Sequence, residues 1–157
     1  MSRSTDTLAW LDSCDAEILA HPGAAMPERE LLRLILGGAS GTGGVLSAAY
    51  RALLQIKVPS LIERDDARGY AHEVMFGSDF GLDPITVPAQ VGSLIQASAV
   101  IHAVDTDTLG ELLIAALLIG EPMDDTAFTL AWDAIPRTFE NYHVILVGGI
   151  YFALLGD

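Results

Sequence analysis

Residues 140–157 read Glu-Asn-Tyr-His-Val-Ile-Leu-Val-Gly-Gly-Ile-Tyr-Phe-Ala-Leu-Leu-Gly-Asp, and this stretch does most to decide the fold. Wound as an α-helix, it is apolar nearly all round, and a helix of that kind has to be buried on several sides. Its apolar run, Val144 to Leu155, falls short of the ~20 residues that span a bilayer. We therefore expect it to be the central helix of a soluble domain.

Upstream of this stretch, apolar residues at helical spacing, caps, and Gly or Pro at segment ends indicate further helices. The expected ranges are about 5–21, 27–36, 45–57, 65–77, 88–104, 106–120 and 125–137. Asp6 is the expected cap of the first, and Asp105 lies at the start of the sixth. No alternating strand pattern of convincing length is present, and no interdomain linker. We expect one all-α domain over 1–157, with about eight helices in packed hairpins that form a short α-solenoid or an irregular bundle.

The charge of the chain limits its partners. With 21 acidic and 8 basic residues the formal charge is −13, which repels polyanions, so we expect no nucleic acid and no membrane surface as partner. The charge suits a neutral or cationic small molecule or a basic peptide, although a solvated acidic surface is the simpler explanation. The single cysteine, Cys14, rules out an intramolecular disulfide, and the N-terminus has no apolar signal core, so a cytoplasmic protein is expected.

A glycine-rich segment, Gly-Gly-Ala-Ser-Gly-Thr-Gly-Gly at 37–44, looks like the strand-to-helix turn of short-chain dehydrogenases. The context differs, because a helix is expected before the segment and no alternating strands follow. No Lys-Ser/Thr follows the glycines, so the segment is not a phosphate-binding P-loop. We interpret it as a flexible connection between two helices and predict no cofactor.

Three of the four histidines, His72, His102 and His143, occupy helical positions where an apolar residue would be expected. Each has an acidic residue within about one turn, and Asp79 is the expected partner that orients His72. The three could be hydrogen-bonded core residues, could line a catalytic pocket as acid–base groups, or could bind a metal. Their spacing alone does not support a metal, and no metal ligand is predicted.

Other residues are candidates for contacting a substrate. Tyr70, Glu111 and Tyr142 are the expected substrate-binding residues, although aromatic residues on helical stripes more often belong to the core. No serine stands in a Gly-x-Ser-x-Gly elbow, and Cys14 is expected to pack in the core rather than to act as a nucleophile.

The most distinctive segment is Tyr-Ala-His-Glu-Val-Met-Phe-Gly-Ser-Asp-Phe-Gly at 70–81, followed by Gly-Glu-Leu-Leu at 110–113 and Asn-Tyr-His at 141–143. Over about residues 65–157 these motifs resemble an uncharacterised bacterial family of small all-helical proteins associated with natural-product gene clusters, especially those for peptides. The resemblance implies a biosynthetic setting and no mechanism. The Asp-Phe-Gly is not a kinase signature, because no catalytic loop accompanies it.

Two functions remain open from the sequence. The first is a tailoring or accessory enzyme that acts on a peptide or small molecule, with the three histidines as proton-transfer groups and Asp79 orienting His72. The second is a non-catalytic helical scaffold whose acidic surface binds a basic protein or leader peptide. The oligomeric state is not predicted.

Overall fold

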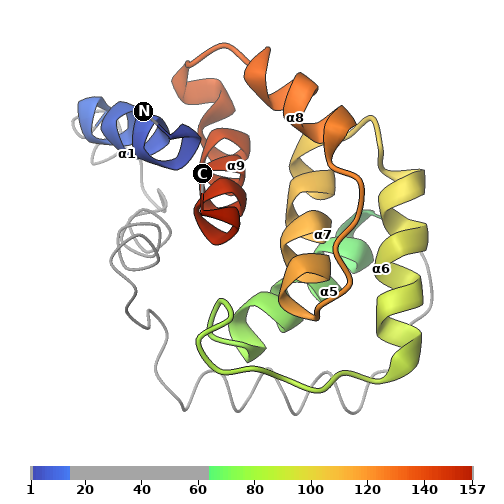
Figure 1. Cartoon of the computed structure of the whole chain (residues 1–157). Helices are drawn as coiled ribbons and strands as arrows, with labels where there is room; N and C mark the ends of the chain where they lie inside the picture. Colours follow the sequence, from blue (N-terminus) through green and yellow to red (C-terminus); the bar gives the residue numbers. More distant parts are fainter. Residues whose placement is uncertain (1, 15–63, 157) are drawn as a thin grey trace.

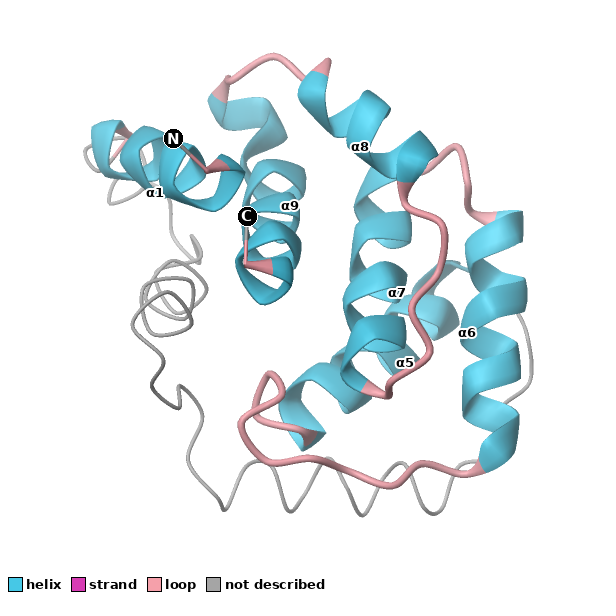
Figure 2. Cartoon of the chain, viewed as in Figure 1, coloured by secondary structure: helices cyan, strands magenta, loops and turns pink. Residues whose placement is uncertain are grey.

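A computed structural model describes residues 2–14 and 64–156 (Figure 1). These residues form six α-helices and one short 3₁₀ helix and contain no strand, which confirms the all-α prediction for this part of the chain (Figure 2). The elements are α1 (Arg3–Ser13), α5 (Arg64–Gly77), α6 (Ala89–Ile101), α7 (Thr106–Leu118), α8 (Thr126–Asp133), the 3₁₀ helix η1 (Phe139–Asn141) and α9 (Tyr142–Leu155).

The described residues thus hold six α-helices and not the eight or so expected for the whole chain. The expected helices at 27–36 and 45–57, the glycine-rich segment and the later part of the first expected helix lie outside the described residues. Three observed helices end earlier than expected. Helix α1 stops at Ser13, with Cys14 as its C-cap, before the expected end at His21. Helix α6 stops at Ile101, and α8 stops at Asp133, before Pro136, since a proline does not favour continuation of a helix.

Helix α7 lies in the middle of the described part and packs against α5, α6, α8 and α9 (Figure 1). Helix α9 packs in turn against α1, so the N-terminal helix covers a helix from the other end of the sequence. Contact of α7 with several helices fits an irregular bundle better than a solenoid, in which each repeat touches only its neighbours.

Helix α9 is buried along most of its length, as its apolar sequence predicts, and it allows unusually close approach at two glycines. The buried residues are Tyr142, Ile145, Leu146, Val147, Gly148, Gly149, Ile150, Tyr151 and Phe152. A Cβ atom at Gly148 would lie 2.0 Å from Nε1 of Trp132 on α8, and one at Gly149 would lie 2.5 Å from a methyl carbon of Thr7 on α1. The two glycines therefore let α8 and α1 pack directly onto the α9 backbone.

The caps agree with expectation at α7 and differ at α1. The Asp105 carboxylate accepts from the backbone N–H of Thr108 at 3.4 Å and from its hydroxyl at 2.9 Å. At α1 the cap is Ser2, whose Oγ accepts from the N–H of Thr5 at 3.3 Å, and the prediction of Asp6 was wrong because the helix begins earlier, at Arg3. None of the helices in the described ranges combines the length and apolar character needed to cross a membrane.

Candidate functional site

A pocket of about 100 Å³ lies where α5, α7 and α9 meet. Its polar side chains are His72 from α5, Glu111 from α7 and His143 from α9. The remaining lining is apolar and consists of Met75, Phe76, Phe80, Ile114, Leu146, Val147 and Ile150. Since a water molecule takes about 30 Å³ of liquid volume, the pocket has room for a few waters or one small apolar group.

Glu111 is the centre of the polar side chains. It is 1% exposed, and its Oε1 lies 3.3 Å from Nε2 of His72 and 3.9 Å from Nε2 of His143. Its other oxygen, Oε2, lies 3.7 Å from Nε of Arg68 and is buried without a hydrogen-bond partner. The contacts at 3.7 and 3.9 Å are ion-pair distances and too long for hydrogen bonds, so this carboxylate keeps unused acceptor capacity.

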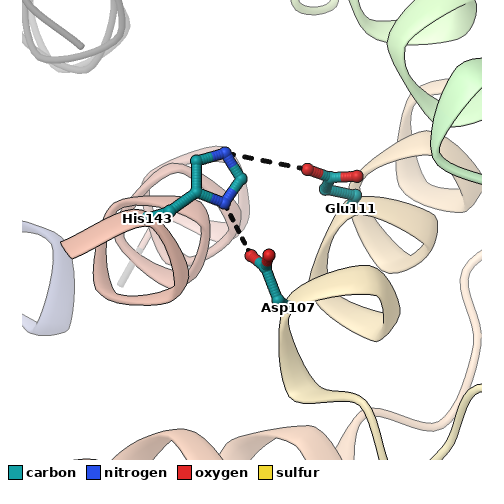
Figure 3. A group of neighbouring side chains, drawn as sticks. All are labelled: Asp107, Glu111 and His143. Atoms are coloured by element: carbon teal, nitrogen blue, oxygen red, sulfur yellow. Dashed lines mark hydrogen bonds and ion pairs between the residues drawn. The ribbon is translucent and has the colours of Figure 1, made fainter. Parts of the chain in front are cut away.

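His143 is held from its other side by Asp107, in the first turn of α7 (Figure 3). Its Nδ1 lies 2.7 Å from Oδ1 of Asp107, and Arg68 pairs with the second oxygen of the same carboxylate. Nε of Arg68 also donates to the Thr108 hydroxyl at 3.1 Å. The first two turns of α7 therefore supply two carboxylates, Asp107 and Glu111, that face the ring of His143.

These contacts shift two pKa values in opposite directions. The hydrogen bond with Asp107 raises the pKa of His143 above its usual value, against the effect of burial, and the charges of Asp107 and Glu111 add to the rise. For Asp107, burial alone would raise the pKa, but the hydrogen bond with His143 and the positive charges of His143 and Arg68 hold it below its usual value. The two shifts favour an imidazolium paired with a carboxylate.

The spacing of these groups could also suit a metal ion. Asp107, Glu111 and His143 each offer one ligand atom, and these atoms lie within 4.8 Å of one another. Arg68 already contacts both carboxylates, however, and a protonated His143 supplies the second positive charge. The cluster is therefore electrically balanced without a divalent cation, which supports proton transfer over metal binding.

The structure brings together three of the predicted site residues, His72, Glu111 and His143. The carboxylate beside His72 is that of Glu111 on α7, whereas Asp79 lies in the turn after α5, outside the lining of the pocket. His102 is the C-cap of α6, also outside that lining, and its buried Nε2 has no hydrogen-bond partner.

The two predicted tyrosines do not line the pocket either. Tyr142 is buried between the rings of Trp10 and Phe139, at centroid distances of 6.5 and 5.7 Å, which is the alternative core role. Tyr70 is half-buried on α5.

Sequence reasoning missed two members of the cluster, Arg68 and Asp107. A signal for both was present. Arg68 lies four residues before His72, and Asp107 lies four residues before Glu111, so each shares a helical face with a residue that was predicted.

Comparison with known proteins gives a family and no function. Residues 28–146 match the model of a domain of unknown function, DUF6895. The match begins well before residue 65, where the motif resemblance starts, and it carries no link to bacteria or to natural-product clusters. No curated protein and no solved structure matches the chain.

Proposed function

Since the chain belongs to the DUF6895 family, a domain of unknown function, we propose its activity from the geometry of the pocket: it is a small enzyme that transfers protons on a bound molecule. The single observation that carries the proposal is the convergence of two imidazoles on one buried carboxylate. His72 and His143 come from different helices, and their Nε2 atoms both face Oε1 of Glu111 at the polar end of an apolar pocket.

His143 is the general acid of the proposed mechanism. Asp107 binds its Nδ1, which fixes the orientation of the ring and stabilises the protonated form. Among the described residues, the acceptor that faces Nε2 is Oε1 of Glu111 at 3.9 Å, too far for a hydrogen bond. A substrate atom that enters the pocket can accept the proton from Nε2.

The His72–Glu111 pair is the base. The two groups lie 3.3 Å apart, and together they can accept one proton that a bound substrate loses. The reaction is thus a proton removed at one atom of the substrate and a proton supplied at another, with no redox change.

For the biological setting we keep the proposal made from the motifs, a tailoring or accessory step on a peptide or other natural product. It rests on the motif resemblance alone, whereas the acid–base chemistry rests on the pocket. The proposal of catalysis therefore stands or falls with the pocket residues, whatever the substrate.

The experiment compares three His→Gln variants in two generic proton-transfer assays: deuterium exchange beside the carbonyl of short aliphatic ketones, and hydrolysis of short-chain p-nitrophenyl esters. We expect His72→Gln and His143→Gln to lower the rate by about 10²–10⁴-fold, the usual contribution of one acid or base. His102→Gln is the matched control, because this histidine lies outside the pocket lining.

Circular dichroism should show the same helical signal in all three variants. A wild-type rate no higher than that of the His72 and His143 variants in every assay would contradict the proposal. It would favour the scaffold function, in which the acidic surface binds a basic peptide.

A further inference from the structure

We propose that the pocket binds an amphipathic small molecule with a neutral amide-like head and a linear aliphatic tail, and that Phe80 limits the length of the tail. The position of the head group rests on the proposed function. The tail and its limit rest on two pockets that share one wall.

The first pocket separates a polar end from an apolar body. Among the residues that the structure describes, the polar side chains of the lining are those of His72, Glu111 and His143, and the others are aliphatic, aromatic or methionine. Glu111 offers an acceptor and His143 a donor at Nε2, and the nearby charges are balanced. A neutral head that both donates and accepts, such as a primary amide, matches this end better than an ion does.

The volume of the pocket limits the tail. A cavity of about 150 Å³ lined by Leu, Ile and Phe binds benzene. The pocket here has about 100 Å³ including its polar end, so it holds a smaller ligand, roughly four or five non-hydrogen atoms with the amide head counted.

A second pocket, of about 340 Å³, continues along the same helices. It is lined by Phe80, Gly81, Leu82, Leu117, Leu118, Ala153 and Leu154. On α7 the lining passes from Glu111 and Ile114 to Leu117, and on α9 from Val147 and Ile150 to Leu154, which are successive turns of one helical face. The two pockets therefore follow each other along the seam between α7 and α9.

Phe80 lines both pockets and is 5% exposed, so its side chain lies at the boundary between them. The backbone fixes this position at a cost. Phe80 has φ 54° and Asp79 has φ 48°, left-handed values that are unfavourable for residues other than glycine. Such strain persists where the surroundings hold it, and it clusters at ligand sites.

The surroundings of Phe80 do hold it in place. Its backbone N–H donates to the carbonyl of Met75 at 2.9 Å, and the buried Ser78 donates to the same carbonyl at 3.1 Å. The ring meets Phe76 edge-to-face at 5.4 Å, and Phe76 meets the ring of His72 in the same way at 6.1 Å. A row of rings thus connects the polar end of the first pocket to its far wall.

The test is a calorimetric titration with linear primary amides from acetamide to decanamide. In the wild-type protein we expect the affinity to rise about three- to fourfold per methylene up to about propanamide, and then to level off or fall. In Phe80→Ala the rise should continue to the longer amides, because their tails enter the second pocket. Phe80→Leu, which keeps part of the wall, should give an intermediate limit.

A second variant controls for the possibility that Phe80→Ala changes the fold. Leu117→Trp fills the second pocket, so alone it should leave the binding of propanamide unchanged, and in the Phe80→Ala background it should restore the wild-type limit. A smooth rise to decanamide in the wild-type protein, or the same limit in Phe80→Ala, overturns the role of Phe80. Absence of binding by all amides overturns the ligand class.

These titrations need no turnover, so they separate the two proposals. Two results together would support the ligand class and contradict the acid–base function. They are amide binding with a chain-length limit, and full rates of the His72 and His143 variants in the proton-transfer assays. If those variants lose rate but no amide binds, the acid–base function would be supported and the ligand class contradicted.

Discussion

Helix α9 contributes residues to two clusters on different sides. The two clusters differ in how completely their polar atoms are hydrogen-bonded. The aromatic cluster consists of Phe128 and Trp132 of α8 and Tyr151 and Phe152 of α9, and each of its two side-chain polar atoms has a hydrogen bond. Nε1 of Trp132 donates to the carbonyl of Val144 at 3.1 Å, and the Tyr151 hydroxyl donates to Asp125 at 2.9 Å.

The polar cluster joins His143 of α9 to two residues of α5 and two of α7. Those four are Arg68, His72, Asp107 and Glu111. In this cluster, one oxygen of a buried carboxylate lacks a hydrogen bond, and two ion pairs stay at 3.7 and 3.9 Å. The contrast is between a cluster whose polar atoms are hydrogen-bonded within the fold and one in which acceptor capacity stays unused, the pattern expected where function competes with stability.

The largest effect on stability should follow from Trp132→Ala in the aromatic cluster. Trp132 is 1% exposed, its ring lies 5.0 Å from that of Phe152, and the Arg137 guanidinium lies 3.9 Å above it. Loss of this ring should lower the free energy of unfolding by about 3–5 kcal/mol, measured by urea denaturation. Trp10→Ala is the matched control, because Trp10 is only half-buried, and it should cost less. Equal losses of stability in the two variants would mean that burial of the ring does not determine the cost of removing it.

Gly148→Ala should cost less, about 1–3 kcal/mol, through overpacking of the same ring. The new Cβ would lie 2.0 Å from Nε1 of Trp132, which is buried and hydrogen-bonded and cannot move away freely. A double-mutant cycle with Trp132→Phe checks the cause, since the smaller ring should relieve the clash. The double variant should then lose less stability than the sum of the two single variants. Additive losses would place the cost elsewhere.

The sequence contained more information about α9 and α7 than about the site between them. An apolar surface all round identifies α9 as a buried helix, and Asp105 identifies the start of α7, because both signals are local. The partner of His72 is not local. Asp79 is the nearer candidate in sequence, whereas the structure supplies Glu111 from the facing helix, and only helix packing decides which faces meet.

The turn after α5 is a second case in which sequence reasoning fell short. Gly81 has a positive φ, which a glycine in a turn predicts, but the left-handed conformation begins earlier, at Asp79 and Phe80. Tertiary packing of the Phe80 ring overrides the local preference, so the wall between the two pockets was not visible in the sequence.

In the polar cluster, Glu111→Gln should change the free energy of unfolding by less than about 1 kcal/mol. Removal of one partner from a fully buried ion pair costs roughly 3–5 kcal/mol, but that figure applies when the remaining charge stays buried. Here the side chains of Arg68, His72 and His143 are 25%, 43% and 47% exposed, so water can replace the carboxylate, as at exposed pairs. A loss as large as that of Trp132→Ala, in the same urea titration, would show that Glu111 is a structural residue.

The smallest effect concerns His143 and Asp107, and it depends on pH. The pKa of His143 is raised in the fold, so its contribution is complete below the unfolded value of about 6.5 and is lost as pH rises through the folded value. The pKa of Asp107 is lowered, so its contribution is present above about 3.8 and is lost as pH falls through the folded value. The side chains of Arg68 and Glu111 also face the pair. Both contributions are therefore present between about pH 4 and 6.5.

Asp107→Asn should remove both contributions. The variant should be less stable than wild type by up to about 1 kcal/mol at pH 5.5, because the His143 side chain is 47% exposed, and the difference should shrink at pH 8.5. Asp133→Asn is the matched control, since Asp133 pairs at 3.0 Å with Arg3, which stays protonated throughout, so its small deficit should be equal at both pH values. If the Asp107→Asn deficit also stays constant between pH 5.5 and 8.5 in urea titrations, His143 is not the group that Asp107 keeps protonated, and the polar cluster would satisfy its charges in the same pH-independent way as a surface ion pair.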